Sequence, residues 1–450
     1  MTIALTAQLG AFVADLTPQA LPEAGREQAR IGFTDTIACL IAGRNEPPVG
    51  IVRQVLGPHG DESTLLFSRD RGRAQALDAA MINGTAAHVL DYDDAALKGH
   101  PSVVLVTAIL AEAEAIGATG EQMITAYIAG YEVWGELVRR DLGNHHMKGL
   151  HPSGIFGCVA AAAACAKLRG MNAKDCATAI GLGASHSAGL MANFGSMAKP
   201  YHCGRAAHAG IMAARLTAAG LTASPDVLEH PRGFLFAYSP KGEIDYETPL
   251  RAGRDWSILA MGLSLKKYPM CYCAHRPLDA MLDLLKARPV APEEVEAVTV
   301  EMSARNYSVL RNRRPQTGLA AKFSVEFAMA SALVAGRCGL PEVQDSFVQR
   351  PEVQALMERV APRFDPREDP FTGYAPFDRV TIRTRAGAEH VSEQVTMARG
   401  AFEIPLSRED IFTKFEGCLI AGHYQGEPEA LFVATMGLDR LSGTAALPLG

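Results

Sequence analysis

Apolar residues recur at helical spacing through residues 1–264 of the chain. Ala-rich segments separated by Gly, Pro or Asn carry the pattern, and Thr119 and Gln122 have capping-box spacing. The segments run over residues 22–43, 72–90, 101–116, 120–140, 154–169, 173–190 and 204–220. Alanine and glycine occupy several faces of them, which is typical of helices packed closely on all sides. The pattern predicts a mainly α fold with a large all-helical domain.

The pattern changes after Lys266. Residues 293–303 and 377–384 alternate at strand period, and residues 388–400 resemble a third strand. Between them, residues 320–336 and 351–360 have helical spacing, and a final helical tail starts near SREDIFTKFEGCL. We therefore predict a smaller α+β lid domain over 265–399, inserted into a helical domain made of 1–264 and 400–450. Crevices between domains are favoured ligand sites.

Composition and charge narrow the class of protein. The chain has 450 residues, of which 48% are hydrophobic and 20% charged, as expected for a folded protein with a large core. The net charge is −6 and no Lys/Arg run is present, which excludes a nucleic-acid groove. The N-terminus lacks a signal-peptide pattern, and no uncharged apolar stretch reaches membrane-spanning length. We expect no nucleic-acid or membrane partner.

Cysteine usage bears on compartment and metal binding. The nine cysteines are an odd number, scattered from Cys39 to Cys418 without a CxxC pair. This usage favours reduced thiols and a cytoplasmic location. Cys271 and Cys273 form the one close pair, and a single intervening residue is poor spacing for zinc ligands. The sequence therefore predicts no metal site.

The tripeptide His-Pro-Ser occurs at residues 100–102 and again at 151–153, and each copy opens a long apolar helical run. Pro fits the first turn of a helix, where free N–H groups attract anions. The repeat therefore places His100, His151 and Ser153 at helix N-termini that could share one acidic substrate. The alternative is two ordinary helix starts with capping or packing histidines.

An acidic run precedes the first copy. The segment HVLDYDD over residues 88–94 brings three acids, beginning with Asp91, close to two histidines. Burying unpaired charge among apolar helices costs free energy, so this density favours a functional site.

Cationic residues lie where the helical part meets the predicted lid. Lys199 and Arg205 bound the segment KPYHCGR, and Lys266 begins KKYPMC. In a helix over 204–220, Arg205 sits in the first turn, where the helix dipole disfavours a cation. An anion nearby would offset this cost. The alternative is a solvated Arg205 and surface lysines.

Five ordered blocks resemble the MmgE/PrpD family, which includes 2-methylcitrate dehydratase, cis-aconitate decarboxylase and iminodisuccinate epimerase. The resemblance covers nearly the whole chain. The blocks are HVLDYDDAALKGHPS, LHPSGIFG, SMAKPYHCGRAAHAG, KKYPMCYCAH and RPQTGLAAKFSVEFAMASAL. Five blocks in one order are far more specific than a single short motif.

The resemblance implies a homodimer with no metal, nucleotide or organic cofactor. The positions that match the family's active-site pattern are Asp91, His100, His151, Lys199, Lys266 and Cys271. Two positions depart from the decarboxylase-like members. Ala95 stands where they have Thr, and Cys271 stands where they have His. These departures argue against decarboxylation by their route.

The implied chemistry is proton transfer next to a carboxylate. A base near neutral pKa and cations that hold the developing enolate are sufficient for it. His100 or His151 is the base in this interpretation, and Asp91 orients a histidine or polarises the site. The expected substrate is a small di- or tricarboxylate. We assign Lys199, Lys266, Arg205 and Ser153 to its binding.

Three hypotheses remain for the activity. The sequence looks most like the epimerase branch, which would invert an N-substituted aspartate such as iminodisuccinate. Cys271 would then be the second acid/base, although it also fits a buried small apolar residue. The main alternative is a 2-methylcitrate-type dehydratase. A non-catalytic carboxylate-binding protein is the alternative from another class.

Overall fold

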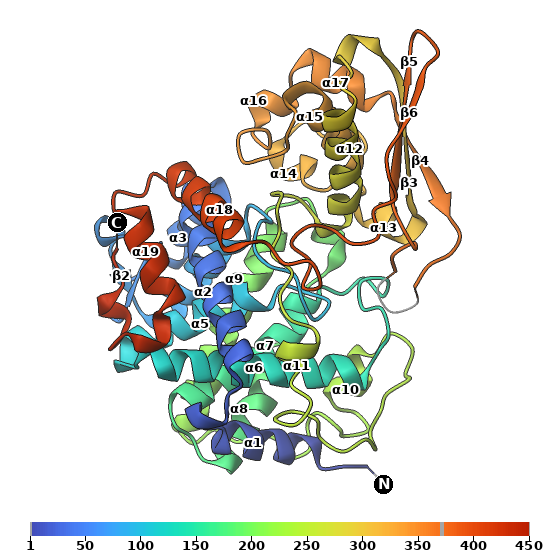
Figure 1. The fold of residues 1–450 in the computed structure, drawn as a ribbon. Helices are drawn as coiled ribbons and strands as arrows, with labels where there is room; N and C mark the ends of the chain where they lie inside the picture. The colour runs from blue at the N-terminus through green and yellow to red at the C-terminus, as the bar shows by residue number, and fades with distance from the viewer. Residues whose placement is uncertain (1, 370–372, 450) are drawn as a thin grey trace.

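A computed structural model describes residues 2–369 and 373–449. Figure 1 shows a large body of packed helices, with a smaller body of helices and a sheet standing on one side of it. We name these the large region, residues 2–264 and 400–449, and the lid region, residues 265–399. The mainly α fold class with a smaller α+β part is confirmed.

Helices build the large region from both ends of the chain (Figure 1). They are α1 (Leu5–Asp15), α2 (Glu23–Gly43), α3 (Pro47–Leu56), α4 (Ala76–His88), α5 (Pro101–Ile116), α6 (Gly120–Arg140), α7 (Pro152–Leu168), α8 (Ala173–Ser185), α9 (Ala198–Ala218), α10 (Phe234–Tyr238), α11 (Ser257–Ala260), α18 (Arg408–Ala421) and α19 (Pro428–Met436). The C-terminal α18 packs against α2. An antiparallel pair, β1 (Ser63–Thr64) and β2 (Arg73–Ala74), was not predicted by the pattern.

Close packing of α4, α7 and α9 explains the abundance of small residues. A Cβ on Gly84 of α4 would lie 2.7 Å from the Cα of Gly204 in α9, so only glycine permits this approach. Most residues of α5 and nearly all residues of α7 are buried. These helices position the α4–α5 loop, the α6–α7 loop and the start of α9, which carry candidate site residues.

The lid region combines short helices with one four-stranded sheet. Its elements are α12 (His275–Ala287), β3 (Val295–Ser303), α13 (Ala304–Val309), α14 (Gly318–Ala321), α15 (Val325–Ala335), α16 (Asp345–Val348), α17 (Pro351–Met357), β4 (Val360–Asp365), β5 (Arg379–Thr384) and β6 (Glu389–Val391). The strand order is β4-β3-β5-β6; β4 runs parallel to β3, and the other pairs are antiparallel.

The strand predictions were partly right. β3 and β5 lie where alternation placed them, whereas the third predicted strand contracts to three residues in β6. The helix predicted over 351–360 ends at Met357, and the unpredicted β4 follows it. β4 contains Pro362 and lies at an edge of the sheet, which is where a strand tolerates proline.

Helix starts near the site follow their capping signals. Thr119 closes the expected capping box, and His100 and His151 are the N-caps of α5 and α7 with Pro in the first turn. The start predicted for α9 at residue 204 was wrong. The helix begins at Ala198, so Arg205 lies two turns further along than expected. Pro200 looks like a helix break in the sequence. In the structure it lies in the first turn of α9, where a helix tolerates proline.

Two separate hydrophobic cores underlie the two regions. One core spans α1–α11 with α18 and α19, and the other joins α12, α15, α17 and the sheet. The exact boundaries 1–264, 265–399 and 400–450 stay a prediction. Among the described residues, no helix is long and apolar enough to cross a membrane.

Candidate active site

A cavity of about 290 Å³ lies between the two regions. The large region contributes the α4–α5 loop (residues 89–100), the α6–α7 loop and the start of α9, and the lid region contributes residues around 271–273 and 305–309. Its charged and titratable lining residues are Asp91, Lys98, His100, His146, Lys199, Lys266, Cys271, Tyr272, Cys273, Arg305 and Tyr374. Five of the sequence-predicted residues meet there: Asp91, His100, Lys199, Lys266 and Cys271.

Asp91 is the anionic centre of the cavity wall. Its backbone has φ of 50°, a strained conformation for a residue with a Cβ, and its carboxylate is almost fully buried. Lys199 Nζ donates to Asp91 Oδ2 at 2.9 Å, and Lys266 Nζ contacts Oδ1. Burial acts to raise the pKa of Asp91, but the two ammonium groups outweigh it and hold that pKa well below its usual range.

The two lysines are held differently. Lys266 is completely buried and also donates to the carbonyl of Asp91 at 2.8 Å. Lys199, in the first turn of α9, lies over the rings of Phe194 and Phe323 with 5.0 and 4.9 Å to the ring centroids. Cation–π contacts and the carboxylate together offset the burial of this ammonium group.

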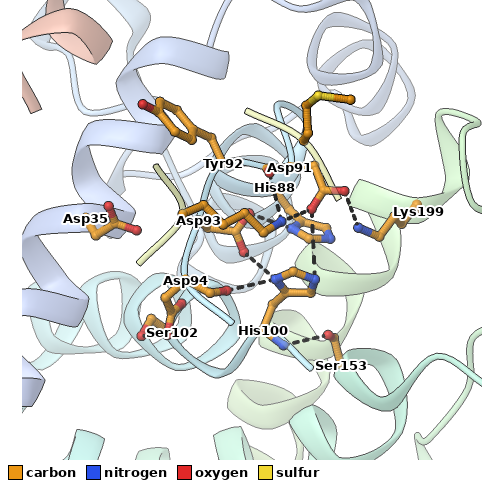
Figure 2. Close-up of polar contacts among 12 residues, drawn as sticks. Asp35, His88, Asp91, Tyr92, Asp93, Asp94, His100, Ser102, Ser153 and Lys199 are labelled. Carbon is orange, nitrogen blue, oxygen red and sulfur yellow. Dashed lines mark hydrogen bonds and ion pairs between the residues drawn. The ribbon is translucent and has the colours of Figure 1, made fainter. Parts of the chain in front are cut away.

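His100 is positioned by carboxylates and by the chain itself (Figure 2). Its Nδ1 lies 2.8 Å from the carbonyl oxygen of Asp94 and 3.2 Å from Asp93 Oδ2, while Nε2 lies 4.0 Å from Asp91 Oδ1. A carbonyl oxygen only accepts hydrogen bonds, so Nδ1 carries the hydrogen and Nε2 of the neutral ring carries the lone pair. Ser153 Oγ accepts from the backbone N–H of His100 at 3.0 Å.

Ser153 therefore has a different role from the one predicted. It is fully buried at the start of α7 and does not line the cavity among the described residues. Its hydroxyl holds the backbone of His100 instead of facing a substrate. Substrate binding by Ser153 is not supported by this placement.

Asp93 and Asp94 complete the support of His100, and the sequence interpretation had not assigned them roles. Asp93 Oδ1 also accepts from His88 Nδ1 at 2.8 Å. Burial acts to raise the pKa of Asp93, but His88 and His100 hold it well below its usual range. The pKa of Asp94 shifts in the opposite direction. Burial, and then the nearby charge of Asp93, raise it well above its usual range.

A buried chain of hydroxyls fixes Asp94. Ser102 Oγ donates to Asp94 Oδ2 at 2.8 Å and lies 2.6 Å from the hydroxyl of Tyr127. Asp94 is therefore harder to ionise than the neighbouring Asp93. The density of acids and histidines over residues 88–100 was the signal that could have identified these supporting residues.

His151 lies behind the cavity wall. It is buried, its ring packs edge-on against Phe194 at 4.9 Å, and its Nδ1 lies 3.0 Å from His202 Nδ1. Burial, then Lys199, holds the pKa of His151 well below its usual range, and burial also lowers the pKa of His88 to about 3. The two His-Pro-Ser copies are therefore not equivalent, because His100 faces the cavity and His151 does not line it.

Cys271 lines the cavity from the lid side. Its backbone N–H donates to the carbonyl of Lys322 at 2.9 Å, and the side chain is buried. A hydrogen bond from the Cys273 thiol lowers the pKa of Cys271, against the effect of burial, while the pKa of Cys273 rises. Cys271 is therefore the more acidic thiol of the pair.

In the part of the chain that the structure describes, Arg205 is not one of the residues that line the cavity. Its guanidinium donates to the carbonyls of Gly154 at 3.0 Å and Ala188 at 2.8 Å, and also to that of His186. These bonds tie α9 to the beginning of α7 and the end of α8. The prediction that Arg205 lies in a first turn beside an anion is wrong. Arg205 lies further along α9, and carbonyl oxygens accept the hydrogen bonds of its guanidinium group.

Within residues 2–369 and 373–449, two groups of side chains have metal-ligand chemistry, although sequence spacing predicted none. Within each group the ligand atoms lie within 4.8 Å of one another. The groups are His88, His151 and Cys203, and His88, Asp91, Asp93 and His100. In the second group both carboxylates already bind cationic or N–H partners. Independence from metal stays a prediction.

A histidine held beside carboxylates on the wall of a cation-rich cavity supplies groups that a proton transfer requires. The chain belongs to the MmgE/PrpD family. The family's N-terminal domain matches residues 7–247, and its C-terminal domain matches residues 268–434. The C-terminal match extends past residue 400 into helices that share the core of the large region.

Two relatives of this chain are both named cis-aconitate decarboxylase. A Homo sapiens cis-aconitate decarboxylase is 28% identical over 351 residues, which cover 75% of this chain and 71% of that protein. A cis-aconitate decarboxylase of Aspergillus terreus is 26% identical over 473 aligned positions, covering 98% and 95%. These similarities are to lyases, and none is to an epimerase.

Proposed function

We propose that this enzyme is a lyase that removes a proton α to a carboxylate of a small di- or tricarboxylate and expels a group from the β carbon. The observation that carries the proposal is the geometry of His100, whose Nε2 faces the cavity while Asp93 and Asp94 hold Nδ1. Proton uptake at Nε2 makes an imidazolium that the adjacent Asp93 carboxylate stabilises.

The other residues have matching roles. Lys199 and Lys266 supply positive charge where the enolate develops, and Asp91 holds both ammonium groups in place. Electrons from the broken C–H bond form the new C=C bond as the β substituent leaves with its electron pair. For a hydroxyl leaving group, a proton from a cavity acid completes water, so the reaction needs no oxidant or reductant. Cys271 has the lowered thiol pKa suited to that acid.

The lyase proposal is supported by the relatives, which are named as decarboxylases, one kind of lyase. Within that class we favour dehydration over decarboxylation. Ala95 and Cys271, the two positions that depart from the decarboxylase-like members, both line the cavity. A 2-methylcitrate-type hydroxy tricarboxylate is therefore the substrate type we propose.

The second candidate is the epimerase. Its support is the presence in one cavity of two groups that can exchange a proton, His100 and Cys271. Reprotonation of the enolate by Cys271 on the other face would invert an N-substituted aspartate such as iminodisuccinate. This candidate has no named relative in its favour.

Proton NMR in deuterium oxide separates the candidates. The purified protein is incubated separately with 2-methylcitrate, cis-aconitate and one stereoisomer of iminodisuccinate. We expect an unsaturated product from 2-methylcitrate, seen as the replacement of the methyl doublet by an allylic methyl singlet, and no inversion of iminodisuccinate. Inversion with deuterium at the α carbon and no alkene would replace the lyase with the epimerase. Exchange with none of these compounds would favour the non-catalytic carboxylate-binding protein.

We further propose a homodimer in the cytoplasm. All nine cysteines are free thiols, which suits a reducing compartment. Light scattering coupled to size-exclusion chromatography tests the dimer, and a mass near 96 kDa, twice the 48.0 kDa chain, is expected.

A further inference from the structure

The loop that carries Asp91 is bound through its backbone by lysine side chains. Its carbonyl oxygens at residues 89, 91 and 92 each accept a hydrogen bond from a buried ammonium group. The bonds run from Lys322 to Val89 at 3.1 Å, from Lys266 to Asp91 at 2.8 Å and from Lys414 to Tyr92 at 2.7 Å. A strained residue such as Asp91 keeps its conformation only where its surroundings hold it, and these bonds supply that hold.

Lys322 differs from the other two donors, because no carboxylate neutralises it. Lys266 also contacts the Asp91 carboxylate, and Lys414 Nζ lies 2.6 Å from Asp35 Oδ1. Lys322 forms no ion pair with any residue in the ranges 2–369 and 373–449, although it is only 3% exposed. Burial lowers its pKa to about 8. A buried ammonium group without a counter-ion costs free energy, so stability does not account for its presence.

The backbone of Lys322 is tied to residues on both sides of the cavity. Lys322 ends α14, and its carbonyl accepts a hydrogen bond from the backbone N–H of Cys271 at 2.9 Å. The ring of the next residue, Phe323, lies under the ammonium group of Lys199, with 4.9 Å from Nζ to the ring centroid. Residues 322 and 323 therefore contact a cavity residue of the lid region and one of the large region, besides the loop at Val89.

We propose that Lys322 is a positioning residue, which holds the α4–α5 loop so that Asp91 keeps its strained conformation. The proposal rests on the proposed function, because Lys199 and Lys266 are placed for the substrate by Asp91. Among the described residues Lys322 does not line the cavity, so it acts through the loop and not on the substrate. The lid region thereby sets the geometry of a loop that belongs to the large region.

Hydrogen–deuterium exchange, measured by mass spectrometry, tests the hold on the loop without turnover. The backbone N–H of Asp91 donates to the carbonyl of His88 at 3.0 Å, so its exchange reports whether the loop keeps its conformation. We expect Lys322→Met to speed exchange over residues 88–94 by roughly fivefold or more and to leave α7 unchanged. Lys286→Met, at an exposed position of the lid region, is the matched control and should change neither.

Kinetics and thermal unfolding separate positioning from a structural role. Lys322→Met should lower kcat by roughly tenfold or more, with a smaller change in KM. Its unfolding temperature should stay close to that of the unaltered protein, because removing a buried charge offsets the loss of the bond to Val89. Lys414→Met should instead lower the unfolding temperature, because Asp35 would be left as a buried carboxylate without its cation.

Unchanged exchange over residues 88–94 in Lys322→Met overturns the proposal, and so does an unchanged kcat. An unfolding temperature lowered as far as in Lys414→Met, or a variant that does not fold, also overturns it, because Lys322 would then be structural. The proposed function is scored separately by the NMR assay on the unaltered protein. If that protein eliminates nothing, the lyase is refuted, and the exchange and unfolding measurements alone decide whether Lys322 holds the loop.

Discussion

The two regions that face the cavity differ in how their polar groups are held. In the large region, Asp91, Asp93 and His100 are each fixed by at least two charged or hydrogen-bonded partners (Figure 2). In the lid region, Asn306 has a buried Nδ2 without a partner among the described residues. Buried atoms without a hydrogen-bond partner occur in both regions, since Asp93 Oδ2 and Asp94 Oδ1 also lack one among the described residues. Within the described ranges, the regions differ in that only the large region joins a histidine to several carboxylates, and such fixed charges preorganise a site.

Under the proposed function, this arrangement assigns the catalytic base to the large region. The α4–α5 loop is preorganised by strained backbone at Asp91 and by the buried chain behind Asp94. Substitutions there should change kcat.

The largest effect is expected at His100. Replacing it with Gln keeps a hydrogen bond from the side chain but removes the base, so kcat should fall by roughly 10²- to 10⁴-fold with a smaller change in KM. Initial rates of the turnover found by NMR provide the measurement. His151→Gln is the matched comparison, and because His151 lies behind the wall its effect should be smaller. A larger loss in His151→Gln would move the base to that residue.

The next effect is expected at Lys199. Lys199→Met keeps the apolar stem between Phe194 and Phe323 but removes a charge-assisted bond of about 1.5–3 kcal/mol. KM should therefore rise roughly 10- to 100-fold. The unfolding temperature must be followed in parallel, since Asp91 loses one partner. Unchanged KM and kcat in a folded variant would remove Lys199 from the site.

Cys271 should have a smaller effect if the enzyme is a lyase. Cys271→Ala should lower elimination less than tenfold, because water in the cavity can protonate a leaving hydroxide. In an epimerase the same change should abolish inversion, while exchange through His100 on one face persists. Deuterium incorporation and optical rotation, measured together, distinguish these results. Rapid inversion in Cys271→Ala would reduce Cys271 to a packing residue.

Much of the fold was predictable because its helices carry strong local signals. The capping box at Thr119 and the Pro-started helices after His100 and His151 were placed correctly. β4 was missed because its pairing with β3 is long-range, and its Pro362 is acceptable only at a sheet edge. The start of α9 was misplaced because Pro200 reads locally as a break.

The sequence identified several residues that line the cavity, but it did not predict how their side chains are oriented or what they contact. Sequence brought together Asp91, His100, Lys199, Lys266 and Cys271, all of which line the cavity. It could not show that His151 turns towards His202, or that the hydroxyl of Ser153 holds a backbone N–H. Arg305 and Asn306 lack any motif, and only the cavity between the two regions shows that they line it.

Buried histidines of the large region should govern part of its response to acid. Burial, then Arg205 and Lys199, lowers the pKa of His202 to about 4, whereas an unfolded histidine has a pKa of about 6.5. Below pH 6.5 the unfolded chain binds the proton first, so stability falls as the pH drops towards 4. His202→Gln should flatten the decline in unfolding temperature across this window. His59→Gln, at an exposed position, is the control; identical slopes in His202→Gln and the unaltered protein would contradict the assignment.

The smallest effect is expected from chelation, and it tests whether the polar cluster of the large region is a metal centre. Its nitrogen, sulfur and oxygen atoms lie close enough to suggest one, yet Asp91 binds two ammonium groups and Asp93 lies between two imidazoles. A dication would have to displace these partners and would lie beside Lys199 and Lys266, which repel it. We therefore expect turnover after exhaustive dialysis against EDTA to match that of untreated protein, with the exchanged buffer alone as control. Full loss of turnover that a divalent ion restores would make this cluster a metal centre. The bound ion would then have to be part of the mechanism, together with the preorganised α4–α5 loop.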